Sequence, residues 1–155
     1  MIAGIEKEFG KEAICGNYID VERVPSGSLV LDEALGGGYG LGRLVELFGY
    51  EASGKSTLAI HACKSIQDTG RSAGYIDTEQ AMDPDYMRAL GVDLSPEKFV
   101  LSQADSAEMA LTIMRRMLDC PDIGIIVLDS IAALVPKARI DGDVGDAVIA
   151  LVARL

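Results

Sequence analysis

An eight-residue segment, Gly49 to Ser56, has the residue types and spacing of a phosphate-binding loop. It fits the pattern G-x-x-x-x-G-K-[ST], in which backbone N–H groups of a glycine-rich loop surround phosphate oxygens. The helix that follows such a loop adds the positive end of its dipole. In this pattern Lys55 reaches the β- and γ-phosphates, and the Ser56 hydroxyl ligates Mg²⁺. The segment therefore predicts binding of a nucleoside triphosphate together with Mg²⁺.

The flanks of this loop supply the expected context, because a P-loop joins a buried strand to a helix. Residues 44–48, Leu-Val-Glu-Leu-Phe, indicate a short buried strand. A helix over 55–68 is predicted from apolar side chains at helical spacing, namely Leu58, Ala59, Ala62, Cys63 and Ile66. With both flanks present, a phosphate loop is favoured over a chance glycine turn.

The composition limits the classes of function. A chain of 155 residues with 49% apolar residues forms one domain with its own core, and no apolar run is long enough to span a bilayer. The net charge of −10 argues against nucleic-acid binding driven by overall charge, although it leaves room for a local basic contact. Cys15, Cys63 and Cys120 fit no metal-binding spacing, so they are interpreted as reduced thiols. His61 has no nucleophile or metal partner nearby in sequence.

Strand and helix patterns alternate along the chain. At the start, Ile2, Ile5 and Phe9 share one face of a helix over 2–9, which packs either on its own domain or on a partner. A helix over 29–35 has Ser28 as its predicted cap and a glycine run at its end. After the P-loop unit we expect strands over 73–77, 98–102 and 123–128 and helices over about 84–90, 106–118 and 146–155. This alternation predicts an α/β fold with a mostly parallel sheet covered by helices.

Polar residues stand at the ends of the predicted strands, where parallel sheets bind their ligands. Asp129 ends the apolar strand 123–128, as in a Walker B segment, and is predicted to hold Mg²⁺ through a water opposite Ser56. Glu79 follows strand 73–77, where a carboxylate can orient or deprotonate an attacking water. Asp77 competes for that role, and a surface glutamate in a turn remains the alternative for Glu79.

Two other patterns fail on closer inspection. The glycine-rich run 36–42 suggests a dinucleotide fingerprint but precedes a strand, whereas the fingerprint follows one. Asp141, Asp143 and Asp146 suggest a calcium loop, yet Gly145 stands where a fifth-position ligand is needed and no glutamate closes the loop.

Beyond these motifs, the chain resembles the bacterial RecA recombinase family over nearly its whole length. The matching stretches keep the family's order and are residues 5–11, 27–36, 49–56, 75–79, 82–86, 90–93, 101–103 and 129–137. The resemblance implies a RecA-type P-loop NTPase in the cytoplasm. It further implies an ATPase whose ATP binding and hydrolysis are coupled to filament formation on single-stranded DNA, for homologous recombination and DNA repair.

The resemblance also assigns roles to individual residues. It implies that Glu79 and Lys55 are catalytic, that Asp83 and Tyr86 contact the adenine base, and that Ser56 and Asp129 hold Mg²⁺. The implied ATP-binding set is Gly49, Glu51, Ala52, Ser53, Gly54, Lys55, Ser56, Thr57, Asp83 and Tyr86. The implied DNA-binding set is Gly142, Gly145, Ala147, Ile149 and Arg154.

The sequence departs from the family at several of these places. Tyr50 stands where the family usually has proline, and Ala52 where it usually has serine. Neither side chain is needed for phosphate binding by the backbone. In the DNA loop, Ala147 and Val148 replace a more usual serine–histidine pair.

The resemblance divides the chain into an N-terminal arm and linker over 1–28, used for oligomerisation, and a partial ATPase core over 29–155. The family's core continues beyond the position of Leu155 with another strand and a second DNA loop. We therefore expect the 155-residue chain alone to be marginally stable and inactive in DNA strand exchange. Two alternatives stay open: another RecA-fold ATPase, such as a helicase motor, and a non-enzymatic protein that binds nucleotide or a partner.

Overall fold

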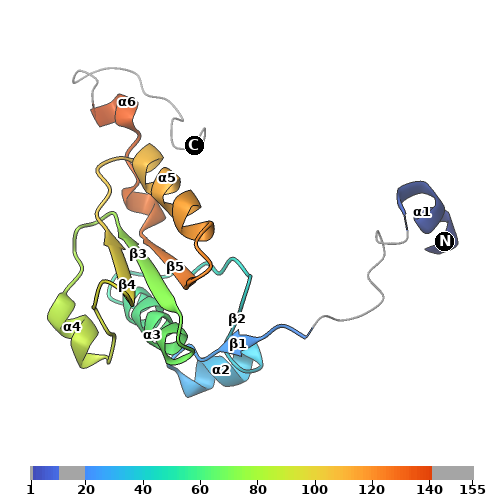
Figure 1. The fold of residues 1–155 in the computed structure, drawn as a ribbon, viewed down its shortest axis with the longest axis horizontal. Coiled ribbons are helices and arrows are strands. Elements are labelled where there is room, and N and C mark those ends of the chain that lie inside the picture. Colours follow the sequence, from blue (N-terminus) through green and yellow to red (C-terminus); the bar gives the residue numbers. More distant parts are fainter. Residues whose placement is uncertain (1, 11–19, 141–155) are drawn as a thin grey trace.

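The structure is a computed structural model that describes residues 2–10 and 20–140 (Figure 1). Its elements in chain order are α1 (Ile2–Phe9), β1 (Arg23–Val24), α2 (Leu29–Leu35), β2 (Tyr39–Gly40), α3 (Lys55–Asp68), β3 (Ser72–Asp77), α4 (Pro84–Ala89), β4 (Phe99–Ser102), α5 (Ala107–Leu118), β5 (Ile123–Asp129), the 3₁₀ turn η2 (Ile131–Ala133) and α6 (Lys137–Ile140). The helix predicted near 146–155 lies outside the described residues.

A parallel three-stranded sheet with the order β4-β3-β5 forms the centre of the molecule and confirms the predicted α/β fold. Tyr75 of β3 lies opposite Leu101 of β4 on one side and Val127 of β5 on the other. Because the strands are parallel, their carboxyl ends meet at one edge of the sheet. Glu79 and Asp129 therefore reach the same edge, as the sequence predicted.

The two faces of the sheet are covered by different helices, and strand alternation decides which residue faces which helix. Tyr75 and Val127 pack with residues of α3, including Ile60. Ile76 and Leu128, one position further along each strand, belong to the cluster that includes Met117 of α5. Helices α3 and α5 thus lie on opposite faces of the sheet (Figure 1).

Most helix boundaries are confirmed, because short-range capping decides them. In α2 the Ser28 hydroxyl accepts a hydrogen bond from the N–H of Leu31, and Gly36 ends the helix in the left-handed region at φ 72°. Helix α3 spans the predicted 55–68. Helix α5 begins one residue later than predicted, since Ser106 is its cap: its side chain accepts from the N–H of Met109.

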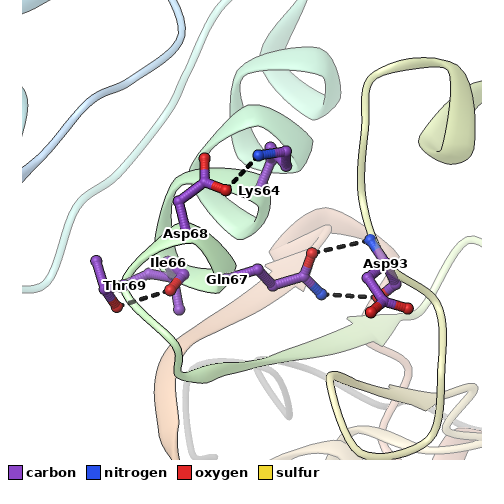
Figure 2. A network of polar contacts seen from close by, with 6 residues as sticks. All are labelled: Lys64, Ile66, Gln67, Asp68, Thr69 and Asp93. Atoms are coloured by element: carbon purple, nitrogen blue, oxygen red, sulfur yellow. Dashed lines mark hydrogen bonds and ion pairs between the residues drawn. The ribbon is translucent and has the colours of Figure 1, made fainter.

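The side chain of Gln67 fixes the segment between α4 and β4 to the end of α3 (Figure 2). Its amide donates to the carbonyl oxygens of Asp93 at 2.7 Å and Lys98 at 3.0 Å, and its oxygen accepts the N–H of Asp93 at 2.9 Å. On the outer side of the same helix, Lys64 forms an ion pair with Asp68. The single side chain of Gln67 thus satisfies backbone groups that are far from it in sequence.

The predicted strand over 44–48 is wrong: these residues form no ladder with any described strand. Leu47 packs against the cluster around Ile66, but Leu44 is fully exposed and Phe48 is 87% exposed. An apolar run shows which residues favour burial, whereas a strand also needs a neighbouring backbone to pair with. In the described part of the chain, β5 pairs with β3 alone and no strand pairs with 44–48.

Two further regions are the β1–β2 pair, which the sequence did not predict, and helix α1, which it did. Strands β1 and β2 pair antiparallel over two residues each, which is too short for an alternating pattern to appear in the sequence. Val24 is buried in a cluster with Ala62 and Ile66 of α3, so a residue of the predicted linker joins the core. Helix α1 forms as predicted and lies apart from the sheet, with Ile2, Ile5 and Phe9 exposed (Figure 1).

Candidate nucleotide-binding site

The predicted phosphate loop joins the extended segment before it to the N-terminus of α3. Gly54 is the N-cap of α3 and adopts φ 89°, a left-handed conformation that glycine adopts without steric cost. Ala52 also has a positive φ of 56°, which is uncommon for a residue with a Cβ. Residues 52–57 line a hollow of about 210 Å³. The first N–H groups of a helix have no partner inside it, so this hollow suits an anion.

Lys55 points back over its own loop. Its ammonium group donates to the carbonyl oxygens of Gly49 at 3.1 Å and Tyr50 at 2.8 Å. Both acceptors are neutral, and phosphate oxygens are stronger acceptors for an ammonium group because they are charged. The lysine is therefore close to the hollow and can exchange these carbonyls for phosphate oxygens.

Hydrogen bonds join the carboxyl ends of β3 and β5. We call this region the carboxylate edge; it consists of residues 77–79 and 129–130. The Thr78 N–H donates to the Asp129 carbonyl and the Thr78 hydroxyl donates to the Ser130 carbonyl, each at 2.8 Å. The Ser130 hydroxyl donates to the Glu79 carboxylate at 2.6 Å. These hydrogen bonds connect the backbone of Asp129 with the residue that carries the Glu79 carboxylate.

Asp129 is held from the centre of the sheet. The Tyr75 hydroxyl donates to its Oδ2 at 2.7 Å. Burial and the neighbouring Asp129 carboxylate raise the pKa of the Tyr75 hydroxyl, so it stays protonated and remains a donor. Asp129 also continues the alternation of Ile125 and Val127, which face α3. Its side chain therefore lies on the face of the sheet that the P-loop helix covers.

Asp77 and Glu79, the two candidates for activating a water, have different surroundings. Asp77 is 2% exposed, and its carboxylate accepts the N–H groups of Ala81 and Met82 at 3.3 and 3.1 Å. Glu79 is exposed and receives only the Ser130 hydrogen bond among the described contacts. A carboxylate that is buried and bonded to the backbone is poorly placed to take a proton from water, and this favours Glu79.

The candidate adenine residues lie at the start of α4, Asp83 as its N-cap and Tyr86 in its first turn, next to the P-loop helix. Asp83 caps α4 by accepting the N–H groups of Asp85 and Tyr86. The Tyr86 hydroxyl is 3.1 Å from the Thr57 hydroxyl, and the tyrosine is 43% exposed. Met87 is fully buried and anchors α4 in the core. The Tyr86 hydroxyl thus lies beside the first turn of α3, and the tyrosine stays partly accessible.

Asp129 at the carboxylate edge and Ser56 at the start of α3 are donors of the kind that fits Mg²⁺ bound with a nucleotide. Mg²⁺ is commonly held by one or two carboxylates together with substrate phosphates, and it keeps several waters. Asp129 supplies such a carboxylate and Ser56, which is exposed, supplies a hydroxyl. Within residues 2–10 and 20–140, no three His, Cys, Asp or Glu side chains gather into a metal cage, so an all-protein site is not offered there.

Two functional candidates escaped the sequence analysis. Tyr75 looked like an ordinary apolar strand residue, and Ser130 lay in a matched stretch without an assigned role. Their alternation and position were visible signals: Tyr75 shares the face of Asp77, and Ser130 directly follows Asp129. Only pairing of β3 with β5 shows which carboxylate each hydroxyl reaches.

Other predicted residues lie elsewhere. The candidate DNA-binding residues, Cys15 and the aspartates 141, 143 and 146 lie outside the described part of the chain. Cys63 is buried in the core, in keeping with a packing role, and burial raises the pKa of its thiol to about 12. His61 packs on Gly27, where an added Cβ would come within 2.5 Å of it. Within the described residues, no helix is long and apolar enough to cross a membrane.

The geometry agrees with the similarity of this chain to known proteins. Residues 1–155 match the RecA N-terminal domain family. The chain belongs to the RecA family. Protein RecA of Lactobacillus johnsonii is 50% identical over 156 residues, which cover 97% of this chain and 43% of that protein. Protein RecA of Gloeobacter violaceus is 46% identical over 159 residues, which cover 100% of this chain and 42% of that protein.

Other RecA relatives lie in the same range. Protein RecA of Bacillus velezensis is 49% identical over 156 residues, covering 97% of this chain and 44% of that protein. The chain thus spans less than half the length of these relatives, and it aligns with them almost from end to end.

Proposed function

We propose that this chain carries the ATP- and Mg²⁺-binding part of a DNA-dependent ATPase that acts in homologous recombination and DNA repair. The observation that carries the proposal is the placement of two features on one face of the sheet. The phosphate loop begins α3, and Asp129 faces that helix at the carboxyl ends of the strands. Membership of the RecA family supports the reading.

In this proposal each residue has a distinct task. Lys55 and the N–H groups at the start of α3 bind the β- and γ-phosphates. Ser56 and Asp129 hold Mg²⁺, which when bound neutralises phosphate charge. Glu79, oriented by Ser130 at 2.6 Å, places the attacking water in line with the γ-phosphate and accepts its proton. Asp83 and Tyr86 form the wall for the adenine base.

Two further parts of the proposal rest on family membership and sequence. Residues Gly142, Gly145, Ala147, Ile149 and Arg154 contact single-stranded DNA in the cytoplasm. The exposed apolar face of α1 docks on a second copy to build a filament, and burial of Phe9 contributes to that contact. Sedimentation of Phe9→Ala on single-stranded DNA tests this: assembly equal to that of the unmodified protein would contradict it.

The test of the main proposal uses two proteins: the 155-residue chain, and a chimera in which it replaces the matching segment of the Lactobacillus johnsonii relative. ATP hydrolysis is measured with and without single-stranded DNA. Hydrolysis stimulated by DNA in the chimera supports a recombinase. Hydrolysis that ignores DNA favours another RecA-fold ATPase. A folded chimera without hydrolysis, beside an active parent, overturns the enzymatic role of these residues.

A second candidate function is non-enzymatic binding of a partner chain. The observation that favours it is the exposed apolar segment around Leu44 and Phe48, beside a sheet whose β5 is only half-buried. Surface of this kind is rare on soluble monomers unless something covers it. Nucleotide binding without hydrolysis in both proteins would favour this candidate.

A further inference from the structure

We propose that Tyr75 is a positioning residue for the magnesium site: its hydroxyl group holds the Asp129 carboxylate in the orientation that the metal requires. The inference rests on the proposed function, because it takes Asp129 as the metal-site carboxylate. It adds a residue that the sequence alone marked only as a core position.

The geometry of the contact follows from strand pairing. Tyr75 lies opposite Val127 in the parallel β3–β5 pair, so Asp129 is its diagonal neighbour two residues along. An aromatic side chain can span that diagonal, and here the Tyr75 hydroxyl reaches Oδ2 of Asp129 at 2.7 Å. The contact needs both the pairing register and the length of a tyrosine.

The tyrosine itself is firmly held. It is 2% exposed and packs with Ile60 and Cys63 of α3. Its ring lies 6.1 Å from the ring of Phe99, centroid to centroid. Because the ring is buried and packed, its hydroxyl group is held in place, whereas the terminal torsion of an aspartate is broad and easily rotated.

The hydrogen bond from Tyr75 gives the two carboxylate oxygens of Asp129 different partners. Oδ2 accepts from Tyr75, which leaves Oδ1 for a water or a metal on the face that α3 covers. Carboxylates that ligate metals are commonly held in this way, and loss of such a supporting partner typically costs about 10–100-fold in metal affinity. The hydroxyl therefore acts on the metal through Asp129 and does not touch it.

A second buried tyrosine supplies a matched control. Tyr39 is 8% exposed, and its hydroxyl has no hydrogen-bond partner among the described residues. It belongs to a different core cluster, with Val24 and Ile66. Tyr39→Phe and Tyr75→Phe each delete one buried oxygen, but only Tyr75→Phe removes the contact to Asp129.

The experiment titrates Mg²⁺ into the 155-residue chain with a fluorescent ATP analogue, and measures Mn²⁺ binding in the presence of ADP by electron paramagnetic resonance. For Tyr75→Phe, the Mg²⁺ concentration at half-maximal response should rise about tenfold, with matching loss of Mn²⁺ affinity. Its nucleotide affinity without Mg²⁺ should equal that of the unmodified chain. Tyr39→Phe should change neither, and in an Asp129→Asn background Tyr75→Phe should have no further effect.

The remaining outcomes overturn the inference. Unchanged or tighter metal binding in Tyr75→Phe would mean that the hydroxyl does not position the carboxylate. A variant that does not fold, or that loses binding with and without Mg²⁺ alike, would assign the hydroxyl to the fold itself. An unmodified chain that binds nucleotide without any response to Mg²⁺ would instead contradict the proposed function, and this result is distinguishable from the others.

Discussion

The two halves of the candidate site are supported in different ways. At the carboxylate edge, hydrogen bonds from Thr78, Ser130 and Tyr75 fix the ends of two paired strands. Segment 44–48, which leads into the phosphate loop, packs through Leu47 but pairs with no described strand, so no strand ladder supports the loop on that side. Lys55, moreover, donates to carbonyls of its own loop.

This difference indicates which half is organised before a nucleotide binds. The carboxylates are already oriented by donors on neighbouring strands, so little reorganisation precedes their use. The lysine must first leave two carbonyl acceptors, which lowers the net gain from each phosphate contact. Mutations of Glu79 should therefore affect chemistry, mutations of Asp129 should affect the response to Mg²⁺, and mutations in the loop should affect nucleotide affinity.

The largest effect is expected at Glu79. Glu79→Gln keeps the size of the side chain and removes the base, so ATP hydrolysis by the chimera should fall by about 10²–10⁴-fold while nucleotide affinity is unchanged. Steady-state hydrolysis and equilibrium binding measure the two effects separately. Glu33→Gln on exposed α2 is the control. Hydrolysis at the unmodified rate in Glu79→Gln would move the role to Asp77.

The next effect is expected in the phosphate loop. Lys55→Ala removes a charge-assisted contact to the phosphates and should cost about 2–3 kcal/mol of nucleotide binding free energy. Isothermal titration with ATP and Mg²⁺ measures the loss. Lys64→Ala, on the same helix but paired with Asp68, should bind nucleotide normally. Unchanged affinity in Lys55→Ala would refute the P-loop assignment.

A smaller effect, on stability alone, is expected away from the site. Gln67→Ala removes the side-chain partner of the Asp93 N–H and carbonyl groups, while the Lys98 carbonyl keeps the Ala73 N–H, and it should lower the free energy of unfolding by about 1–3 kcal/mol. Asp68→Ala breaks only an exposed ion pair and should cost at most about 1 kcal/mol. Urea unfolding of both variants checks the difference, and equal midpoints would show that the Gln67 contacts add little.

A further effect is expected only at alkaline pH. The Cys63 thiol has a pKa of about 12 in the folded chain and an ordinary value of 9.0. Its raised pKa contributes stability that is complete below pH 9 and is lost as pH rises toward 12. The unfolding free energy should then fall with a slope of at most about 1.4 kcal/mol per pH unit from this group. Unfolding of Cys63→Ala should show a shallower slope, and identical slopes would contradict this account.

Some features of the protein were decided locally and could be predicted from sequence. Capping by Ser28 and Gly36 placed α2, and helical spacing placed α3 over 55–68. The position of Glu79 and Asp129 at one edge followed from strand alternation with helices, because parallel strands end together. These features depend on near neighbours in the chain, whose identities the sequence gives directly.

Other features needed partners that are distant in sequence. The apolar run 44–48 predicted a strand, but pairing depends on a neighbouring backbone that local pattern does not specify. Tyr75 and Asp129 are 54 positions apart, and only the β3–β5 register brings the hydroxyl to the carboxylate. The different burial of Asp77 and Glu79, which favours Glu79 as the proposed base, likewise appears only in the tertiary structure.

The sequence by itself therefore determined the candidate chemistry of this protein: a segment of phosphate-loop type, a carboxylate proposed to bind metal and a carboxylate proposed as the base, each at the end of a strand or the start of a helix. The tertiary structure decided how those groups are held. Tyr75 reaches Asp129 from the neighbouring strand, and Ser130, which directly follows β5, reaches Glu79. Which strands are neighbours depends on packing of the whole sheet against α3 and α5.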